Sequence, residues 1–97
     1  MTVRYLAESR VEVDDAANYY RSERVGLDTE FLDEIEHGLK QVLEHPFRWP
    51  QVARRVRRYR IDRFPYGIVY EVQNSIIVVV AVMHLSRRPG YWRGRLG

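Results

Sequence analysis

The residues best suited to chemistry or binding lie near the end of this 97-residue chain, after a long apolar run. His84 closes that run, and imidazole is the side chain whose pKa is most easily brought near neutrality for proton transfer. Arg87, Arg88, Tyr91 and Trp92 follow it, so that cations and aromatic rings are interleaved. This pattern suits stacking or cation–π contact with a base or a protein partner. We therefore expect function at the exit of the apolar run.

Two of these residues have an alternative, structural interpretation. His84 could be a general base, or it could be a structural residue at the margin of a sheet whose hydrogen bonds are satisfied within the fold. Trp92 could close a hydrophobic core beside Trp49. Local spacing alone leaves both interpretations open.

A second group of candidate residues is a run of arginines before the apolar segment. On a strand, alternate side chains face opposite ways, so about half of the group can form one patch. Such a patch would contact nucleic acid or an acidic protein surface. Alternatively, the charges protect an edge strand from aggregation. The group comprises Arg54, Arg55, Arg57, Arg58, Arg60 and Arg63.

Several kinds of site are not expected from this sequence. There is no cysteine, and His37 and His45 are eight residues apart, which is not the spacing of a helical metal pair. No glycine-rich phosphate loop or serine–histidine–acid set is visible, and the helical carboxylates alternate with apolar positions as on a solvated face. We expect neither a metal nor another cofactor.

Charge is strongly segregated along the chain. Residues 1–45 hold eleven acidic and five basic residues, a net charge of −6, whereas residues 46–97 hold two acidic and eleven basic ones, a net charge of +9. A basic working face with an anionic partner would explain this asymmetry. The N-terminal residues carry charges where a signal peptide needs its apolar core, and residues 76–82 are too few to span a membrane. We therefore expect a cytoplasmic protein with no membrane association.

The helices that must support the site are predicted by apolar spacing. After a short strand over residues 2–7, Ser9 and Glu12 match a capping box, which predicts a helix from there to about Arg24. Gly26 ends it, as a residue free to adopt positive φ. A second helix follows from Leu27 and stops near Glu44, because Pro46 disfavours helix at the residue before it.

The strands are predicted over the second half of a single domain that spans residues 1–97. The apolar residues in 53–63 fall at both odd and even positions, so they do not follow the alternation of a regular strand with one buried face. This indicates a bulge between Val56 and Tyr59 or a ragged edge strand. Residues 66–72 alternate as a half-buried strand does, and residues 76–82 read as a strand covered on both faces. The expected fold is α+β, in the order β-α-α-β-β-β, with a helical hairpin packed on one face of a small, mainly antiparallel four-stranded sheet.

This order of elements resembles the RelE/ParE superfamily of bacterial toxins. The resemblance covers nearly the whole chain and rests on Ala16, Ala17 and Tyr20 in the first helix, the end of the second helix before Pro46, the segment RFPYGIVYEV, and the apolar strand that enters His84 and RRPGYW. It implies the toxin of a type II toxin–antitoxin, or plasmid-stabilisation, module, neutralised by a cognate antitoxin protein.

The superfamily implies two activities, and the residues favour one of them. RelE-like members cut mRNA on the ribosome with basic and aromatic residues, whereas ParE-like members inhibit DNA gyrase. Arg60 stands where the nucleases place a basic residue. Asp62 and Gly67 stand where the nucleases place further basic residues. The resemblance therefore favours a ParE-like gyrase inhibitor without bond chemistry of its own. Its expected contact residues are Arg60, Arg63, His84, Arg87, Arg88, Tyr91 and Trp92.

The resemblance leaves two alternative functions. In a ribosome-dependent mRNA interferase, Arg60 and Arg87 would hold phosphates while His84 or Tyr91 handled the proton. A non-toxic member would only bind an antitoxin and regulate its own operon.

Overall fold

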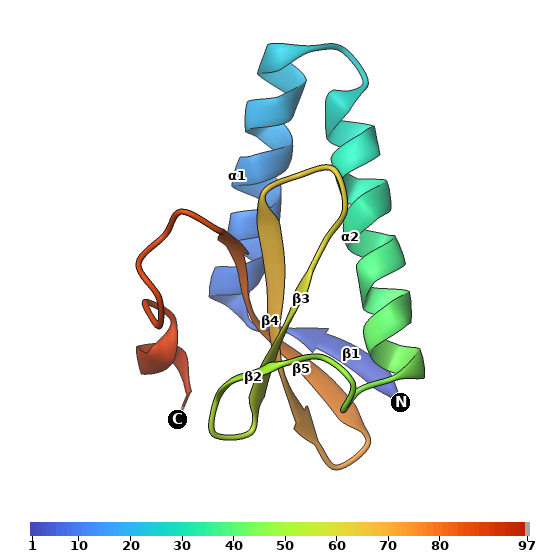
Figure 1. Cartoon of the computed structure of the whole chain (residues 1–97). Helices are drawn as coiled ribbons and strands as arrows, with labels where there is room; N and C mark the ends of the chain where they lie inside the picture. The colour runs from blue at the N-terminus through green and yellow to red at the C-terminus, as the bar shows by residue number, and fades with distance from the viewer. Residues whose placement is uncertain (97) are drawn as a thin grey trace.

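The chain folds into two antiparallel helices packed on one face of a five-stranded sheet (Figure 1). The structure is a computed structural model that describes residues 1–96. In chain order its elements are β1 (Thr2–Tyr5), α1 (Ala7–Glu23), α2 (Leu27–Glu44), β2 (Gln51–Ala53), β3 (Val56–Arg60), β4 (Tyr66–Gln73), β5 (Ile76–His84) and the short 3-10 helix η1 (Arg93–Arg95).

The sheet is mixed, with strands in the order β1-β5-β4-β3-β2. β1 runs parallel to β5, with Thr2 opposite Ile76, and every other neighbouring pair is antiparallel. The α+β class and the helical hairpin are as predicted, but the expected count of four strands is wrong. β2 is the additional strand, and its three residues are too few to show a periodic pattern in the sequence.

Helix α1 begins three residues earlier than predicted, and the predicted capping box is wrong. Its N-cap is Leu6, which makes no side-chain capping bond. The buried Ser9 hydroxyl lies 2.8 Å from the Leu6 carbonyl oxygen and 2.9 Å from the Val79 carbonyl oxygen, so it ties the helix to β5. The positive φ expected at Gly26 is present, at 87°, and gives the tight turn into α2.

Helix α2 has the predicted bounds and buries one apolar stripe against the sheet. Phe31, Ile35 and Val42 are buried on that stripe. Gly38 lies among them, and a Cβ atom there would come within 2.9 Å of the Tyr59 ring. The absent side chain therefore allows α2 to approach β3 closely.

Residues 53–63 contain a turn and a regular strand, so neither the bulge between Val56 and Tyr59 nor a ragged edge strand is present. Arg54 and Arg55 form the turn between β2 and β3, with Arg55 at a φ of 65°. Val56 and Tyr59 are both buried because they contribute to different cores on the two faces of the sheet. The inconsistent parity thus reflects burial on both faces.

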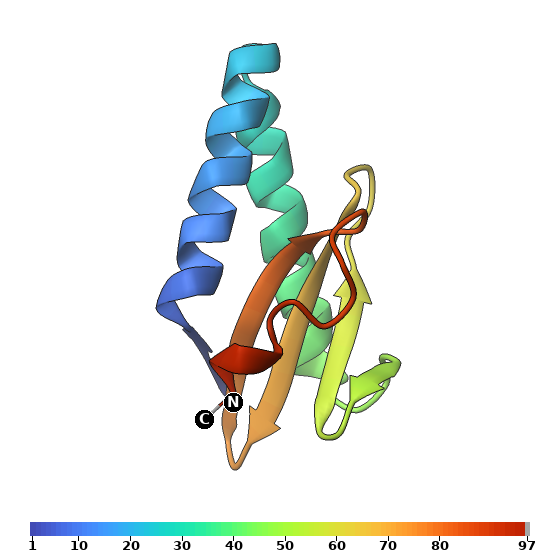
Figure 2. The same ribbon diagram turned by 90° about the vertical axis from the view of Figure 1, so that its left-hand side faces the viewer.

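The second face of the sheet is covered by residues 85–96, which we name the strap (Figure 2). Trp92 anchors the strap: it is 2% exposed and packs in a cluster with Val56, Val69 and Met83. Trp49 instead belongs to the helix-side core, where its ring lies 4.7 Å from that of Tyr59. Trp92 therefore closes a core, but not beside Trp49. Within residues 1–96, no helix has the length and apolarity needed to cross a membrane.

Candidate functional site

The structure brings three of the predicted contact residues together at one cleft. His84, Arg87 and Tyr91 line a cleft of about 190 Å³ between α1 and the strap, with Tyr19 and Tyr66 contributing further aromatic surface. β5 positions His84 as its last residue, and the following turn carries Arg87 back toward α1. The predicted grouping at the exit of β5 is therefore present in space for these three residues.

His84 is held by its neighbour in one hydrogen-bonded arrangement. Its Nδ1 atom accepts the Ser86 backbone N–H at 3.1 Å and lies 2.7 Å from the Ser86 hydroxyl oxygen. Because an amide nitrogen only donates, Nδ1 carries the lone pair, and the neutral ring holds its proton on Nε2. In this arrangement the imidazole offers a donor to the cleft, whereas a general base needs a free lone pair.

Tyr91 is enclosed by two arginines and a carboxylate. The guanidinium carbons of Arg87 and Arg95 lie 4.0 and 5.1 Å from the centre of its ring, within cation–π range. Its hydroxyl donates to Glu12 Oε2 at 2.5 Å. Burial raises the pKa of Tyr91 well above its ordinary value, and the bond to the Glu12 carboxylate raises it further. The phenol is therefore a poor proton donor for catalysis.

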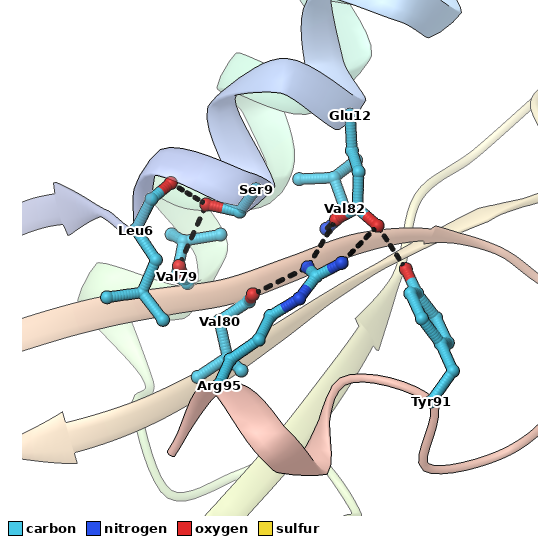
Figure 3. Close-up of polar contacts among 8 residues, drawn as sticks. All are labelled: Leu6, Ser9, Glu12, Val79, Val80, Val82, Tyr91 and Arg95. Carbon is cyan, nitrogen blue, oxygen red and sulfur yellow. Dashed lines mark hydrogen bonds and ion pairs between the residues drawn. The ribbon is translucent and has the colours of Figure 1, made fainter. Parts of the chain in front are cut away.

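Glu12 and Arg95 form the centre of a network that fixes the strap (Figure 3). Arg95 Nη1 lies 2.8 Å from Glu12 Oε1, and Nη2 lies 3.0 Å from Oε2, so the pair is bidentate. Both side chains are 17% exposed. Burial would raise the pKa of Glu12, but bonds from Arg95, Tyr91 and the Val82 amide outweigh it and hold the pKa below its ordinary value. Glu12 is therefore a permanent anion at neutral pH.

This network forms hydrogen bonds with backbone groups at the open edge of β5. β1 pairs only as far as Val79, and Val80 forms a bulge that has no partner residue in β4. Arg95 donates to the Val80 carbonyl oxygen at 3.1 Å, and the Val82 N–H donates to Glu12 at 3.0 Å. Two side chains thus satisfy backbone groups that a neighbouring strand would otherwise bind. Sequence reasoning missed this role of both residues, because no local pattern connects positions 83 residues apart.

Comparison with known proteins identifies the family. The family described as "ParE toxin of type II toxin-antitoxin system, parDE" matches residues 3–89. The chain belongs to this ParE toxin family. The predicted resemblance is therefore confirmed, and the molecule is a type II toxin by family. None of the curated proteins compared with the chain matches it.

The fold of this ParE family member is also found in a solved structure described as the chromosomal ParDE toxin–antitoxin system from P. aeruginosa. The two superpose with a TM-score of 0.73 at 15% sequence identity, over 87% of this chain and 95% of that chain. At this identity the likeness concerns the fold. The family match ends at residue 89, so Tyr91 and Arg95 lie beyond it.

The other predicted contact residues of this ParE family member lie away from the strap cleft or are covered. Arg63 forms an ion pair with Glu30 of α2 and does not pair with Asp62. Arg60 is exposed at the end of β3 opposite Gly67, and Arg88 is exposed on the strap. Trp92 is buried, so its indole is not available to a partner in this fold.

Gly67, where the resemblance to the nucleases would imply an arginine, is covered by a neighbouring side chain. A Cβ atom on Gly67 would lie 2.9 Å from Cδ of Arg58, so the Arg58 side chain covers this position. Arg58 and Arg93 line a second pocket, of about 230 Å³, beneath the strap. The chain therefore keeps basic groups on this face of the sheet.

Proposed function

We propose that this toxin inhibits DNA gyrase by binding to it, and that a cognate antitoxin neutralises it in the cytoplasm. The observation that carries the proposal is the hydrogen-bonding state of the strap cleft. Nδ1 of His84, the Tyr91 hydroxyl and the Glu12 carboxylate are all engaged within the chain. No group of this set is left free to move a proton, which supports binding over catalysis.

The exposed groups are suited to an acidic target surface. Arg60, Arg87 and Arg88 are exposed and present guanidinium groups, and the half-buried His84 keeps its donor on Nε2, so each offers donors and none offers an acceptor. Arg63 shares its charge with Glu30 and adds less to this surface. Guanidinium groups bind carboxylates through a planar fork, which supports a protein or nucleic-acid partner of negative charge.

The strap is anchored at both sides of the turn that carries two of these donors, Arg87 and Arg88. Its centre is anchored by buried Trp92, and the Glu12–Arg95 pair fixes η1 against β5. Pre-ordered side chains lose less conformational entropy on binding, which raises affinity for a given set of contacts. The Tyr91 ring, which is bonded to Glu12 through its hydroxyl, provides a fixed contact for the Arg87 guanidinium at 4.0 Å.

The test is a gyrase supercoiling and DNA-cleavage assay with the purified full chain and its Arg87→Gln/Arg88→Gln variant. We expect the natural chain to block supercoiling and the variant to lose most of that effect while retaining its melting temperature and its antitoxin binding. Retention of antitoxin binding separates loss of the target surface from loss of the fold. The matched control is Arg4→Gln/Arg10→Gln, which removes the same charge from exposed positions elsewhere.

Two other results would contradict the proposal. Cleavage of mRNA on programmed ribosomes, without any effect on gyrase, would establish the mRNA interferase alternative. Antitoxin binding without either activity, and without toxicity when the chain is produced alone, would establish the non-toxic alternative.

A further inference from the structure

A larger hollow lies at the other end of the sheet from the strap cleft. It has a volume of about 680 Å³ and is formed by the connection after α2, the β2–β3 turn and the β4–β5 turn. These three segments gather at the lower end of Figure 1. The hollow includes the last residues of β4, whereas the strap cleft includes Tyr66 at the start of that strand. The two sites share no lining residue.

We infer that this hollow binds a short stretch of single-stranded nucleic acid. A base would stack on the ring of Phe47, and the adjoining phosphates would contact Arg55 and Arg57. The hollow has the volume of a small-molecule site, which is enough for one or two nucleotides. This inference goes beyond the proposed inhibition of gyrase and does not depend on it.

Phe47 provides an exposed ring on a restrained backbone. Its side chain is 64% exposed, although a phenylalanine normally contributes to a core. Pro46 precedes it, and the carbonyl oxygen of Pro46 accepts a hydrogen bond from the Tyr70 hydroxyl at 2.7 Å. Tyr70 is fully buried, so this bond ties the connection to the sheet. The ring is therefore held at the rim in a position where a flat group can stack on it.

Two guanidinium groups provide the positive charge. Arg57 donates to the Trp49 carbonyl oxygen at 2.7 Å, which orients its guanidinium 5.7 Å from the centre of the Phe47 ring. Arg55 lies in the β2–β3 turn at the edge of the hollow. None of the ion pairs among residues 1–96 involves either arginine. Their remaining N–H groups can therefore bind phosphate oxygens.

The rest of the lining matches a nucleotide better than an acidic peptide. Gln51, Gln73 and Asn74 contribute amides, which supply both donors and acceptors for the edges of a base. The one acidic residue of the lining, Glu71, accepts a hydrogen bond from Gln73. An acidic peptide would use the arginines but would leave the exposed ring without a flat partner. A duplex would use the arginines too, but its bases are already stacked on one another.

Fluorescence anisotropy with the full chain tests this inference. The probes are fluorescein-labelled oligodeoxyuridine and oligouridine of about ten nucleotides, which differ only in the 2′-hydroxyl and lie within the range bound by small single-strand modules. We expect binding that weakens with salt, because phosphate contacts release counterions. A preference for one probe would identify the sugar that the site reads, and equal binding would show that base and phosphate suffice.

Matched variants locate the binding site. Phe47→Leu should weaken binding about tenfold, the size of one lost base–aromatic stack, whereas Phe47→Tyr should retain it. Arg55→Asn should also weaken binding, and asparagine tolerates the positive φ of this turn. Arg4→Gln is the control, because it removes the same charge from an exposed position on β1. Circular dichroism of each variant confirms folding.

Three results would overturn the inference: equal affinity of Phe47→Leu and the natural chain, equal affinity for a duplex of the same length, or displacement of the oligonucleotide by an oligoglutamate peptide at similar concentration. Because the hollow and the strap cleft share no residue, Phe47→Leu should leave gyrase inhibition by the strap unchanged. A failure of either proposal is therefore distinguishable from a failure of the other.

Discussion

Glu12 in the middle of α1 and Arg95 in η1 form a bidentate ion pair, with N–O distances of 2.8 and 3.0 Å, although 83 residues separate them in the chain. The pair joins three parts of the fold, because Glu12 also accepts the Val82 N–H of β5. It is the polar counterpart of the apolar anchor that Trp92 provides on the same strap. The position of the strap cleft therefore depends on this ion pair, of which Glu12 itself lines the cleft.

Glu12→Gln should destabilise the fold by about 2–3 kcal/mol, because it leaves the partly buried Arg95 guanidinium without its counter-charge. The free energy of unfolding in urea measures this loss. The control is Asp14→Asn, which removes an exposed carboxylate from the same helix and should change stability little. Equal stability of Glu12→Gln and the natural chain would show that the ion pair does not hold the strap.

The same pair predicts a pH dependence with a defined sign. The pKa of Glu12 in the folded chain lies below its ordinary value of 4.5. Its contribution is therefore fully present above about pH 4.5 and is lost as pH falls through the folded-state pKa. The stability difference between the natural chain and Glu12→Gln should shrink across that acidic range. A difference that stayed constant down to complete protonation of Glu12 would contradict the assignment.

Trp92→Ala should destabilise the fold by about 3–5 kcal/mol, the cost of removing a large buried aromatic side chain. Trp92→Phe should cost clearly less, since most of the apolar contact is retained. Thermal unfolding followed by circular dichroism provides the comparison, and Arg88→Ala on the exposed part of the strap serves as the control. A small effect of Trp92→Ala would mean that Trp92 is a contact residue and not an anchor.

The two close glycines should respond differently to alanine. At Gly38 a Cβ atom would lie 2.9 Å from the buried Tyr59 ring and 3.0 Å from Ile68, so overpacking should exceed the gain in helix propensity and cost about 1 kcal/mol net. At Gly67 the new atom meets only the flexible chain of Arg58 closely, and stability should change by less than about 0.5 kcal/mol. Urea unfolding of both variants measures the difference. A larger loss at Gly67 would show that Arg58 cannot move aside.

Elements that follow one clear rule could be predicted from the sequence. The bounds of α2 follow from a single apolar stripe and from Pro46 after its end. Alternation correctly predicts a strand at β4, but the prediction of one exposed face is wrong, because Gly67 and Val69 are buried on the side that the strap covers. β3 shows where such rules fail. The burial of both Val56 and Tyr59 conflicts with a regular strand only if one face of the sheet is assumed to be buried. The strap that buries the second face is a long-range contact without a local signal.

The candidate site was predictable to the extent that its residues are close in sequence. His84, Arg87 and Tyr91 meet because two successive turns join them, one from His84 to Arg87 and one from Arg88 to Tyr91. Arg63 instead pairs with Glu30. Ser9 and Glu12 have the spacing of a capping box, yet Ser9 bonds to the carbonyl oxygen of Val79 and Glu12 bonds to Arg95. A four-residue pattern describes only local competition for hydrogen bonds, and here tertiary partners prevail.

The parallel pairing of β1 with β5 also has a consequence for the timing of synthesis. Residues 2–5 find their strand partner only when residues 76–79 have been made, and the strap follows later still. A nascent chain on the ribosome therefore lacks both the neighbour of its first strand and the surface that we propose binds the target. On the function proposed above, the target would be bound only after translation is nearly finished, so a cognate antitoxin already present would meet each molecule as it is released.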